Sequence, residues 1–163
     1  MAISWPQFVY YTRRHPLFLF GLTVGVLSIL LAIVGPYVGP HDPTTSDPRA
    51  VSKPPSSEHP FGTDTSGMDV LSRVLAAPRT DVTIGLVAAV LSFSVGSVLG
   101  LLGGFYRGWG SKLLMRISDV VQSFPSFVLA LLLVAFAGRN MFNIIATLTI
   151  LYTPIFLRLT RGD

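Results

Sequence analysis

The sequence predicts an all-α protein with about four membrane-spanning helices. Two observations support this prediction: the low content of charged residues and three long stretches without any charge. Half of the 163 residues are apolar and 12% are charged, against about a quarter charged in an average soluble domain. Residues 17–34, 82–106 and 141–157 contain no charged residue. A helix needs about 20 mostly apolar residues to cross a hydrocarbon core about 30 Å thick. Such stretches rarely occur in the core helices of soluble proteins.

The net charge of +4 does not indicate nucleic-acid binding. Phosphate recognition needs a basic surface, whereas the Lys and Arg residues here lie singly or in pairs at the ends of the apolar stretches. That distribution is typical of membrane topology. Because the chain has no cysteine, disulfides and thiolate metal sites are excluded.

Residues 1–16 are expected to form a short cytoplasmic segment, and residues 17–38 the first membrane helix. A cleaved signal peptide is the alternative, since basic residues precede the apolar run. Signal peptides have an apolar core of about 7–15 residues and a small-x-small cleavage site. The run here is longer, and Gly35-Pro36-Tyr37 is a poor cleavage context, which favours an uncleaved helix.

Residues 39–81 are predicted to form an extracytoplasmic loop, because six prolines in its first half exclude a regular helix there. Ser66 and Asp69 then resemble a helix capping box. The apolar positions among residues 70–75 share one helical face. We therefore expect a short amphipathic helix on the membrane surface, with Asp69 and Arg73 spaced to pair.

Residues 82–163 are predicted to hold three further membrane helices. A polar connection and a tight turn at Gly138-Arg139-Asn140 separate them. The expected helices cover residues 82–105, about 117–137 and about 141–157, and the polar connection covers residues 106–116.

Small residues recur at every fourth position of the second predicted span: Ala88, Ser92, Gly96, Gly100 and Gly104. Small side chains at this spacing allow two helix backbones to approach closely in lipid. Glycine and alanine are also common in membrane helices generally, but a column of five favours a packed interface with another helix.

The spacing of four polar residues in the third predicted span places them on one helix face: Asp119, Gln122, Ser123 and Ser126. Polar groups at membrane depth are costly unless they face a bundle interior or a wet path. The stripe is therefore a candidate for part of a translocation path. The alternative, left open at this point, is that Asp119 pairs with Arg116 and the other three simply pack.

The residues His41, Asp42, Glu58 and His59 are the conceivable metal ligands. They lie in a loop without helical spacing and without a recognisable hydrogen-bonding partner, so we predict neither a metal site nor a cofactor. The sequence contains no Walker A, GxSxG or HExxH motif, so it gives no case for an enzyme.

Charge distribution predicts the orientation of the four spans. The N-terminus, the 106–116 connection and the C-terminal tail carry seven Lys and Arg residues, and the other two connections carry five together with six acids. Basic residues close to the spans weigh most in setting topology. We therefore expect a cytoplasmic N-terminus and an external proline-rich loop.

A series of motifs resembles one known family. The segments His59-Pro-Phe-Gly-Thr-Asp64 and Gly67-Met-Asp-Val-Leu-Ser-Arg73 are similar to the "HPxGTD…GRDVLSR" signature of permease subunits from dipeptide and oligopeptide ATP-binding-cassette (ABC) importers, with Met68 where the family usually has arginine. Residues 103–109, 115–119 and 124–126 follow in the family's order and spacing. The signature positions are Gly62, Thr63, Asp64, Gly67, Asp69 and Arg73.

The resemblance implies a type I importer permease fold in the plasma (inner) membrane. Such a permease subunit forms half of a translocation path for peptides and has no ATPase activity of its own. The implied partners are a second permease subunit, two ATP-binding subunits, an extracytoplasmic peptide-binding protein and the lipid bilayer, with no nucleic acid. The sequence reaches Asp163 just before the family's EAA loop, so residues 82–163 correspond to an incomplete permease domain.

Two alternatives come from other classes of protein. A self-contained four-helix transporter driven by protons would need a titratable carboxylate inside the membrane, but the first two predicted spans have none and Asp119 sits at the edge of the third. A non-transporting membrane anchor would not associate with ATPase subunits even when an EAA-bearing extension is present.

Overall fold

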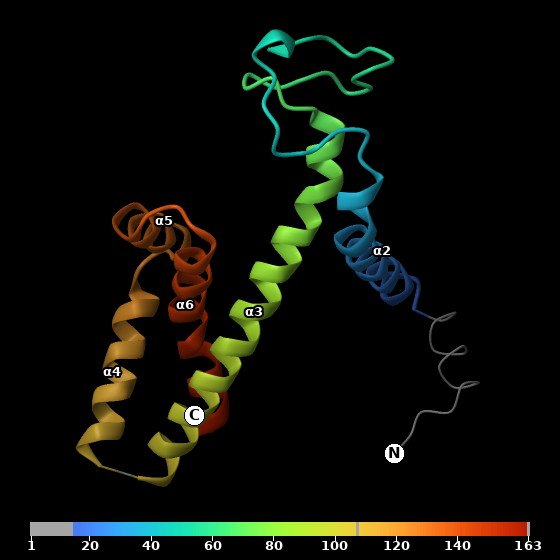
Figure 1. The fold of residues 1–163 in the computed structure, drawn as a ribbon. Coiled ribbons are helices and arrows are strands. Elements are labelled where there is room, and N and C mark those ends of the chain that lie inside the picture. The colour runs from blue at the N-terminus through green and yellow to red at the C-terminus, as the bar shows by residue number, and fades with distance from the viewer. Residues whose placement is uncertain (1–14, 107, 163) are drawn as a thin grey trace. The chain divides into compact units, whose positions relative to one another are not determined.

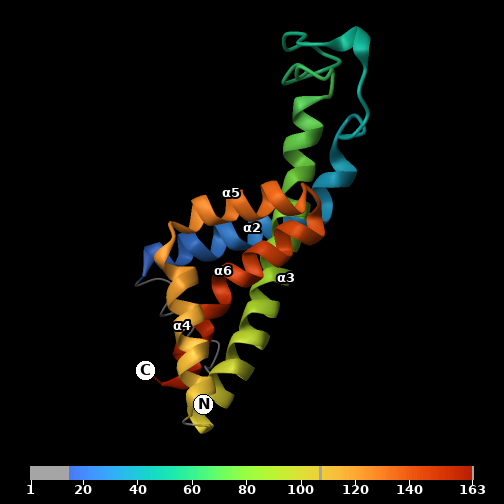
Figure 2. The ribbon, with the colours of Figure 1, turned by 90° about the vertical axis from the view of Figure 1, so that its left-hand side faces the viewer.

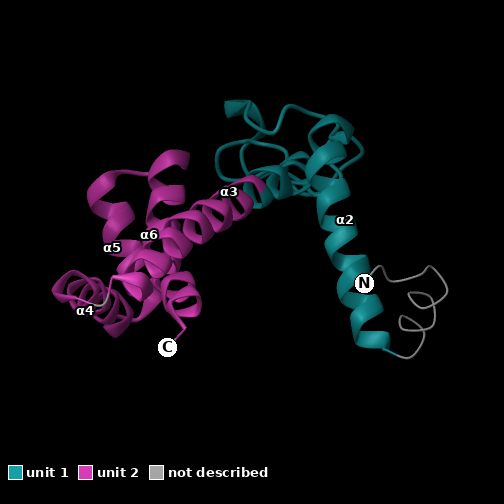
Figure 3. Ribbon diagram, turned by 90° about the horizontal axis from the view of Figure 1, so that it is seen from below, with its two compact units in different colours: residues 1–82 teal, residues 83–163 magenta. Residues whose placement is uncertain are grey.

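The computed structural model describes residues 15–106 and 108–162, and these residues form α-helices without a β-strand (Figure 1). The helices are α2 (Pro16–Val38), α3 (Val70–Phe105), α4 (Trp109–Ser123), α5 (Ser126–Ala137) and α6 (Met141–Arg161), with a 3-10 turn, η1, at Pro48–Ala50. The chain divides into two compact units, residues 1–82 and 83–163 (Figure 3). The predicted all-α class is confirmed.

Three of the described helices, α2, α3 and α6, are long and apolar enough to cross a membrane. The pair α4 and α5 passes the same test jointly but is bent by 96°, so it would make a fourth span. Large apolar side chains remain exposed along these helices, among them Leu17, Leu101 and Phe136. Lipid is the environment in which such surfaces are stable, which agrees with the predicted polytopic membrane protein.

In the first unit, the C-terminal end of α2 packs against the first turns of α3. Gly35 is buried there, because a Cβ at this position would overlap the backbone carbonyl of Leu75. The guanidinium of Arg79 lies 6.0 Å from the centre of the Tyr37 ring. The expected cytoplasmic segment of residues 1–16 lies, up to residue 14, outside the described residues.

The helix α3 is longer than expected, because it joins two predicted elements. A surface helix near residues 70–75 and a separate span from residue 82 were expected, but Val70–Phe105 is a single helix of 36 residues that contains Pro78. Leucine, alanine and arginine around Pro78 are strong helix formers, and one proline removes only one backbone hydrogen bond. At 1.5 Å per residue the helix is about 54 Å long, more than a hydrocarbon core requires.

The third predicted span also differs from the expectation, because it is two helices, α4 and α5, instead of one (Figure 2). The helix α4 already begins at Trp109, inside the expected polar connection, and ends at Ser123. Phe124 has extended backbone angles (φ −85°, ψ 143°), and α5 starts after Pro125. The ring of a proline disfavours helical angles in the preceding residue, so Pro125 accounts for the break.

The turn between α5 and α6 lies where it was predicted. Gly138 has φ +95°, and its N–H donates to the carbonyl of Val134 at 2.9 Å. The Asn140 side chain caps α6 by accepting from the N–H of Asn143 at 2.8 Å. The Asn143 amide in turn donates to the Gly138 carbonyl at 3.1 Å, which holds the two helix ends together.

Candidate functional site

The small-residue column of α3 lies against α6 in the second unit. Ala88 and Ser92 are buried, at 3% and 0% exposure. The Ser92 hydroxyl lies 2.7 Å from the carbonyl of Ala88 on its own helix and 3.3 Å from that of Thr149 on α6. The ring centroids of Phe93 and Phe156 lie 5.6 Å apart in an edge-to-face arrangement beside the column.

The glycines of the column allow the closest approach. A Cβ at Gly96 would lie 2.7 Å from the Thr153 carbonyl oxygen, and one at Gly100 would overlap the Thr160 side chain. At Gly104 the contact is looser, since a Cβ would lie 3.5 Å from the nearest atom of α6. Residues 96 and 100 therefore mark where the backbones of α3 and α6 come closest.

The polar stripe does not form one face, which corrects the expectation from sequence. Asp119, Gln122 and Ser123 are carried by α4, but Ser126 begins α5 beyond the 96° bend. Asp119 pairs with Arg158 of α6, its Oδ1 lying 2.5 Å from the guanidinium Nη2. The alternative pairing with Arg116 is therefore wrong.

Two serines that were not predicted from the sequence face inward from α4. Ser118 is buried and lines a mostly apolar cavity of about 250 Å³ together with residues of α3 and α6, including Thr153 and Pro154. Ser111, one heptad earlier, is also buried and donates to the Gly103 carbonyl at 2.7 Å. Their seven-residue spacing is the signal that could have placed both on the inner face.

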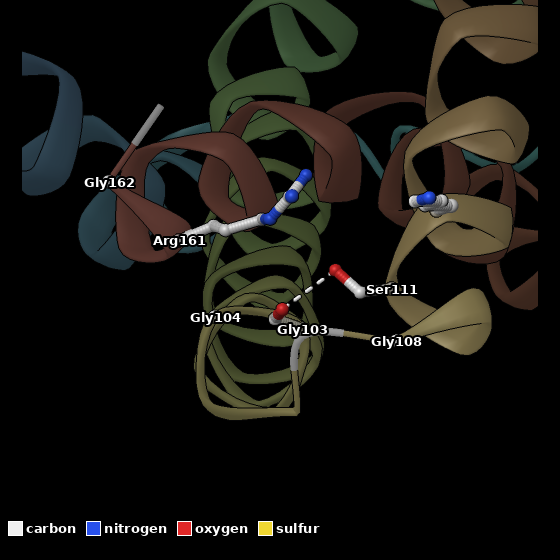
Figure 4. Close-up of a pocket in the computed structure, with 7 residues that line it drawn as sticks. Gly103, Gly104, Gly108, Ser111, Arg161 and Gly162 are labelled. Carbon is white, nitrogen blue, oxygen red and sulfur yellow. Dashed lines mark hydrogen bonds between the residues drawn. The ribbon is translucent and has the colours of Figure 1, made fainter.

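A basic recess of about 370 Å³ lies where the end of α3, the start of α4 and the end of α6 meet (Figure 4). Lys112 and Arg161 supply its cationic side chains. Its other walls come from Ser111 and from the glycines Gly103, Gly104, Gly108 and Gly162. The recess therefore combines two cationic side chains with backbone from the C-terminal ends of two helices, whose free carbonyl groups are partly negative.

In the first unit, the signature residues stabilise the loop between α2 and α3. The Thr63 hydroxyl accepts from the Lys53 N–H at 2.8 Å and donates to the Ala50 carbonyl. Gly62 and Gly67 have φ values of +72° and +75°, which favour glycine. A Cβ at Gly67 would also overlap the Asp47 carbonyl.

Asp64 is the carboxylate that closes this loop. It accepts from the N–H groups of Ser66 and Met68 at 2.8 and 3.0 Å and forms an ion pair with Arg73. The hydrogen bond from the Met68 N–H is the main cause that holds the pKa of Asp64 below its ordinary value.

Asp69, and not Ser66, caps α3. Its Oδ2 accepts from the N–H and the hydroxyl of Ser72, both at 2.8 Å, and its Oδ1 lies 3.0 Å from Nδ1 of His59. The expected pairing of Asp69 with Arg73 is therefore wrong. Burial raises the pKa of Asp69, but the bonds from Ser72 and His59 outweigh it and the net shift is downward.

The loop also brings together three of the four conceivable metal ligands. One ligand atom each from His41, Glu58 and His59 lies within 4.8 Å of the others. Asp42 is not among them, and its carboxylate accepts from the N–H and hydroxyl of Thr44 at 2.7 and 2.6 Å. No hydrogen-bonding partner for these residues is recognisable in the sequence, and that was the reason for predicting no metal site. The contact between His59 and Asp69 shows that such a partner exists.

Comparison with known proteins yields matches in both halves of the chain. Residues 96–163 match the family described as binding-protein-dependent transport system inner membrane component. Residues 4–55 match the N-terminal transmembrane domain of oligopeptide transport permease C.

Curated relatives cover nearly the whole chain. A probable D,D-dipeptide transport system permease protein of Escherichia coli is 36% identical over 96% of this chain and 53% of its own length. A glutathione transport system permease protein of Pectobacterium atrosepticum is 36% identical over 98% and 52%. An oligopeptide transport system permease protein of Bacillus subtilis is 34% identical over 98% and 52%. The chain thus spans about half the length of these relatives.

The helices and their packing define a polytopic α-helical membrane protein. Within that class, the chain is a relative of the permease subunits of dipeptide- and oligopeptide-type ABC importers, and the resemblance stated from its motifs is confirmed.

Proposed function

We propose that this chain acts as a membrane-spanning permease subunit of an ABC importer and forms half of the translocation path for peptides. The observation that carries the proposal is similarity to peptide and glutathione permeases over 96–98% of the chain. The three helices long enough to cross a membrane, with the bent pair α4 and α5, support the membrane-spanning part of the proposal.

The partners follow from the same proposal. They are a second permease subunit, two ATP-binding subunits on the cytoplasmic side and an extracytoplasmic peptide-binding protein. ATP hydrolysis resides in the ATP-binding subunits, so this chain is not itself an enzyme. The description of the matched family as binding-protein-dependent supports the last of these partners.

Within this arrangement, the polar side chains of α4 and the start of α5 contribute to the path: Asp119, Gln122, Ser123 and Ser126. The helix-packing role belongs to Ala88, Ser92, Gly96, Gly100 and Gly104. Residues 1–16 lie in the cytoplasm, 17–38 form the first span, 39–81 lie outside with the first turns of α3, and 82–163 form a partial permease domain.

Co-purification tests the proposal. The chain is extended with the C-terminal half of a homologous permease, including its EAA loop, and expressed with the cognate ATP-binding subunits and second permease subunit. We expect the tagged chain to retain the ATP-binding subunits, and a matched extension whose EAA loop is replaced by a Gly/Ser linker to lose them. Absence of the ATP-binding subunits from both preparations contradicts the proposal and favours a membrane anchor.

A further inference from the structure

The loop of residues 39–69 is held in one conformation by bonds between its two arms. The Ser52 N–H donates to the Asp64 carbonyl at 3.0 Å, and the Thr63 N–H donates to the Lys53 carbonyl at 3.1 Å. The Ser46 hydroxyl donates to the Ser66 carbonyl. The chain on either side of Glu58 is therefore fixed, and side chains far apart in sequence keep a defined spacing.

His59 is oriented as metal-binding histidines are. It is buried, and its Nδ1 lies 3.0 Å from Oδ1 of Asp69, which leaves Nε2 to bind a ligand. Asp69 is itself held by two bonds from Ser72. A carboxylate that fixes the tautomer and ring orientation of a histidine is the usual outer partner of a metal ligand.

His41 and Glu58 complete the donor set from two other points of the loop. The backbone N–H of His41 donates to the Ser72 hydroxyl at 3.0 Å. The ring centroids of His41 and His59 lie 4.7 Å apart. A local turn holds Glu58 beside His59, since the Ser56 N–H donates to the His59 carbonyl at 2.9 Å and the His59 N–H to the Ser56 hydroxyl at 3.0 Å.

We propose that His41, Glu58 and His59 bind one zinc ion, with Asp69 holding His59 in place. Two imidazoles and a carboxylate form a donor set that zinc uses when a water occupies its fourth position. Ligand atoms around tetrahedral zinc lie about 3.3 Å apart, given bonds of about 2.0–2.1 Å. The present spread of up to 4.8 Å closes by rotation of Glu58, which is exposed, and of His41, whose side chain is 38% exposed.

The site adds the middle of the loop to the contact that the end of α2 already makes with the start of α3. It ties the exit of α2 at His41 to the middle of the loop at Glu58 and His59, and through Asp69 to the start of α3. The negative charges of Glu58 and Asp69 offset the charge of the ion. A bound zinc therefore stabilises the fold of the loop, because the folded chain binds it and the unfolded chain has no assembled site.

Zinc titration of the purified full chain in detergent, followed by calorimetry after metal removal, tests the site. We expect one zinc per chain for the unaltered protein and for His15→Gln, which removes the third histidine of the sequence and serves as the matched control. His41→Gln and Glu58→Gln should each weaken zinc binding by about tenfold or more. Unchanged affinity in both variants, or no binding by the unaltered protein, overturns the proposal.

Two further measurements distinguish a loss of zinc ligands from a loss of folding. His59→Gln also removes the contact with Asp69, so the test relies on His41→Gln and Glu58→Gln, which leave that contact intact. Asp69→Asn keeps an oxygen for the Ser72 bonds but loses the charge, and we expect zinc binding to weaken about 10- to 100-fold. Cobalt substitution should give the visible absorption of a four-coordinate ion, and an octahedral spectrum overturns the assigned ligands.

Discussion

Asp119 and Arg158 join α4 to α6 through an ion pair, with 2.5 Å between Oδ1 of the aspartate and Nη2 of the arginine. Their side chains are 50% and 40% exposed. At the edge of the span, where the sequence predicts Asp119 to lie, water and salt screen such a pair. Half-exposed pairs of this kind contribute about 0–1 kcal/mol. The structure therefore gives Asp119 a partner without giving it a large role in stability.

The first prediction separates stability from transport at this pair. Asp119→Asn should lower the free energy of unfolding by no more than about 1 kcal/mol, while peptide uptake by the assembled transporter falls if the residue lines the path. Thermal unfolding in detergent and vesicle uptake measure the two effects. The exchanged pair Asp119→Arg with Arg158→Asp is the control, and a full return of uptake in it would show that the ion pair alone matters.

The second prediction concerns the approach of α3 to α6. Gly100→Ala should destabilise the protein by about 1–3 kcal/mol, because the added Cβ would overlap the Thr160 side chain. Gly85→Ala is the matched control on the same helix, where a Cβ meets nothing within 4 Å. That substitution should be neutral or mildly stabilising. Equal melting temperatures for the two variants would contradict the packing.

The third prediction follows from the lowered pKa of Asp64. A carboxyl whose folded pKa lies below its unfolded value of about 3.9 stabilises the fold above that value and loses the contribution as pH falls through the folded pKa. Limited proteolysis of the loop should therefore accelerate on acidification below about pH 4.

Asp64→Asn should make the loop more susceptible at neutral pH and weaken the dependence on pH. Asp42→Asn is the control, since the Asp42 carboxylate bonds to neighbouring Thr44 and does not close the loop. If both variants keep the cleavage profile of the unaltered protein, Asp64 does not hold the loop.

The fourth prediction tests the orientation. Because the sequence contains no cysteine, Lys53→Cys and Lys112→Cys each introduce a single thiol at an exposed position. A membrane-impermeant maleimide applied to intact cells should label position 53 and spare position 112 until the membrane is opened. The reverse pattern would invert the topology argued from charge.

Much of the fold follows from the sequence, for identifiable reasons. Uncharged runs of helical length predicted α2 and α6, and Gly138 with Asn140 predicted the turn between α5 and α6. Two prolines were harder to interpret: Pro78, just before the second predicted span, and Pro125, within the third. Pro78 is accommodated within α3 whereas Pro125 separates two helices, and a single sequence does not show which carbonyl groups find other partners.

The contacts of the polar residues were less predictable. Asp69 has Arg73 four residues away, at good helical spacing, yet its carboxylate bonds to His59 and Ser72. Asp119 likewise bonds to a residue 39 positions away instead of to Arg116. Spacing rules apply along one helix, whereas these partners come together through loop closure and helix packing, which local patterns do not encode.

The break at Phe124–Pro125 restricts what can surround that corner of the molecule. Where α4 stops, its last carbonyl groups lose the helical donors that would follow, and Pro125 has no N–H to offer. The Ser123 hydroxyl donates to one of these carbonyl groups, that of Val120, at 2.7 Å. Hydrocarbon tails cannot supply hydrogen bonds to the others, so the elbow is stable only where another polypeptide, water or lipid headgroups reach them.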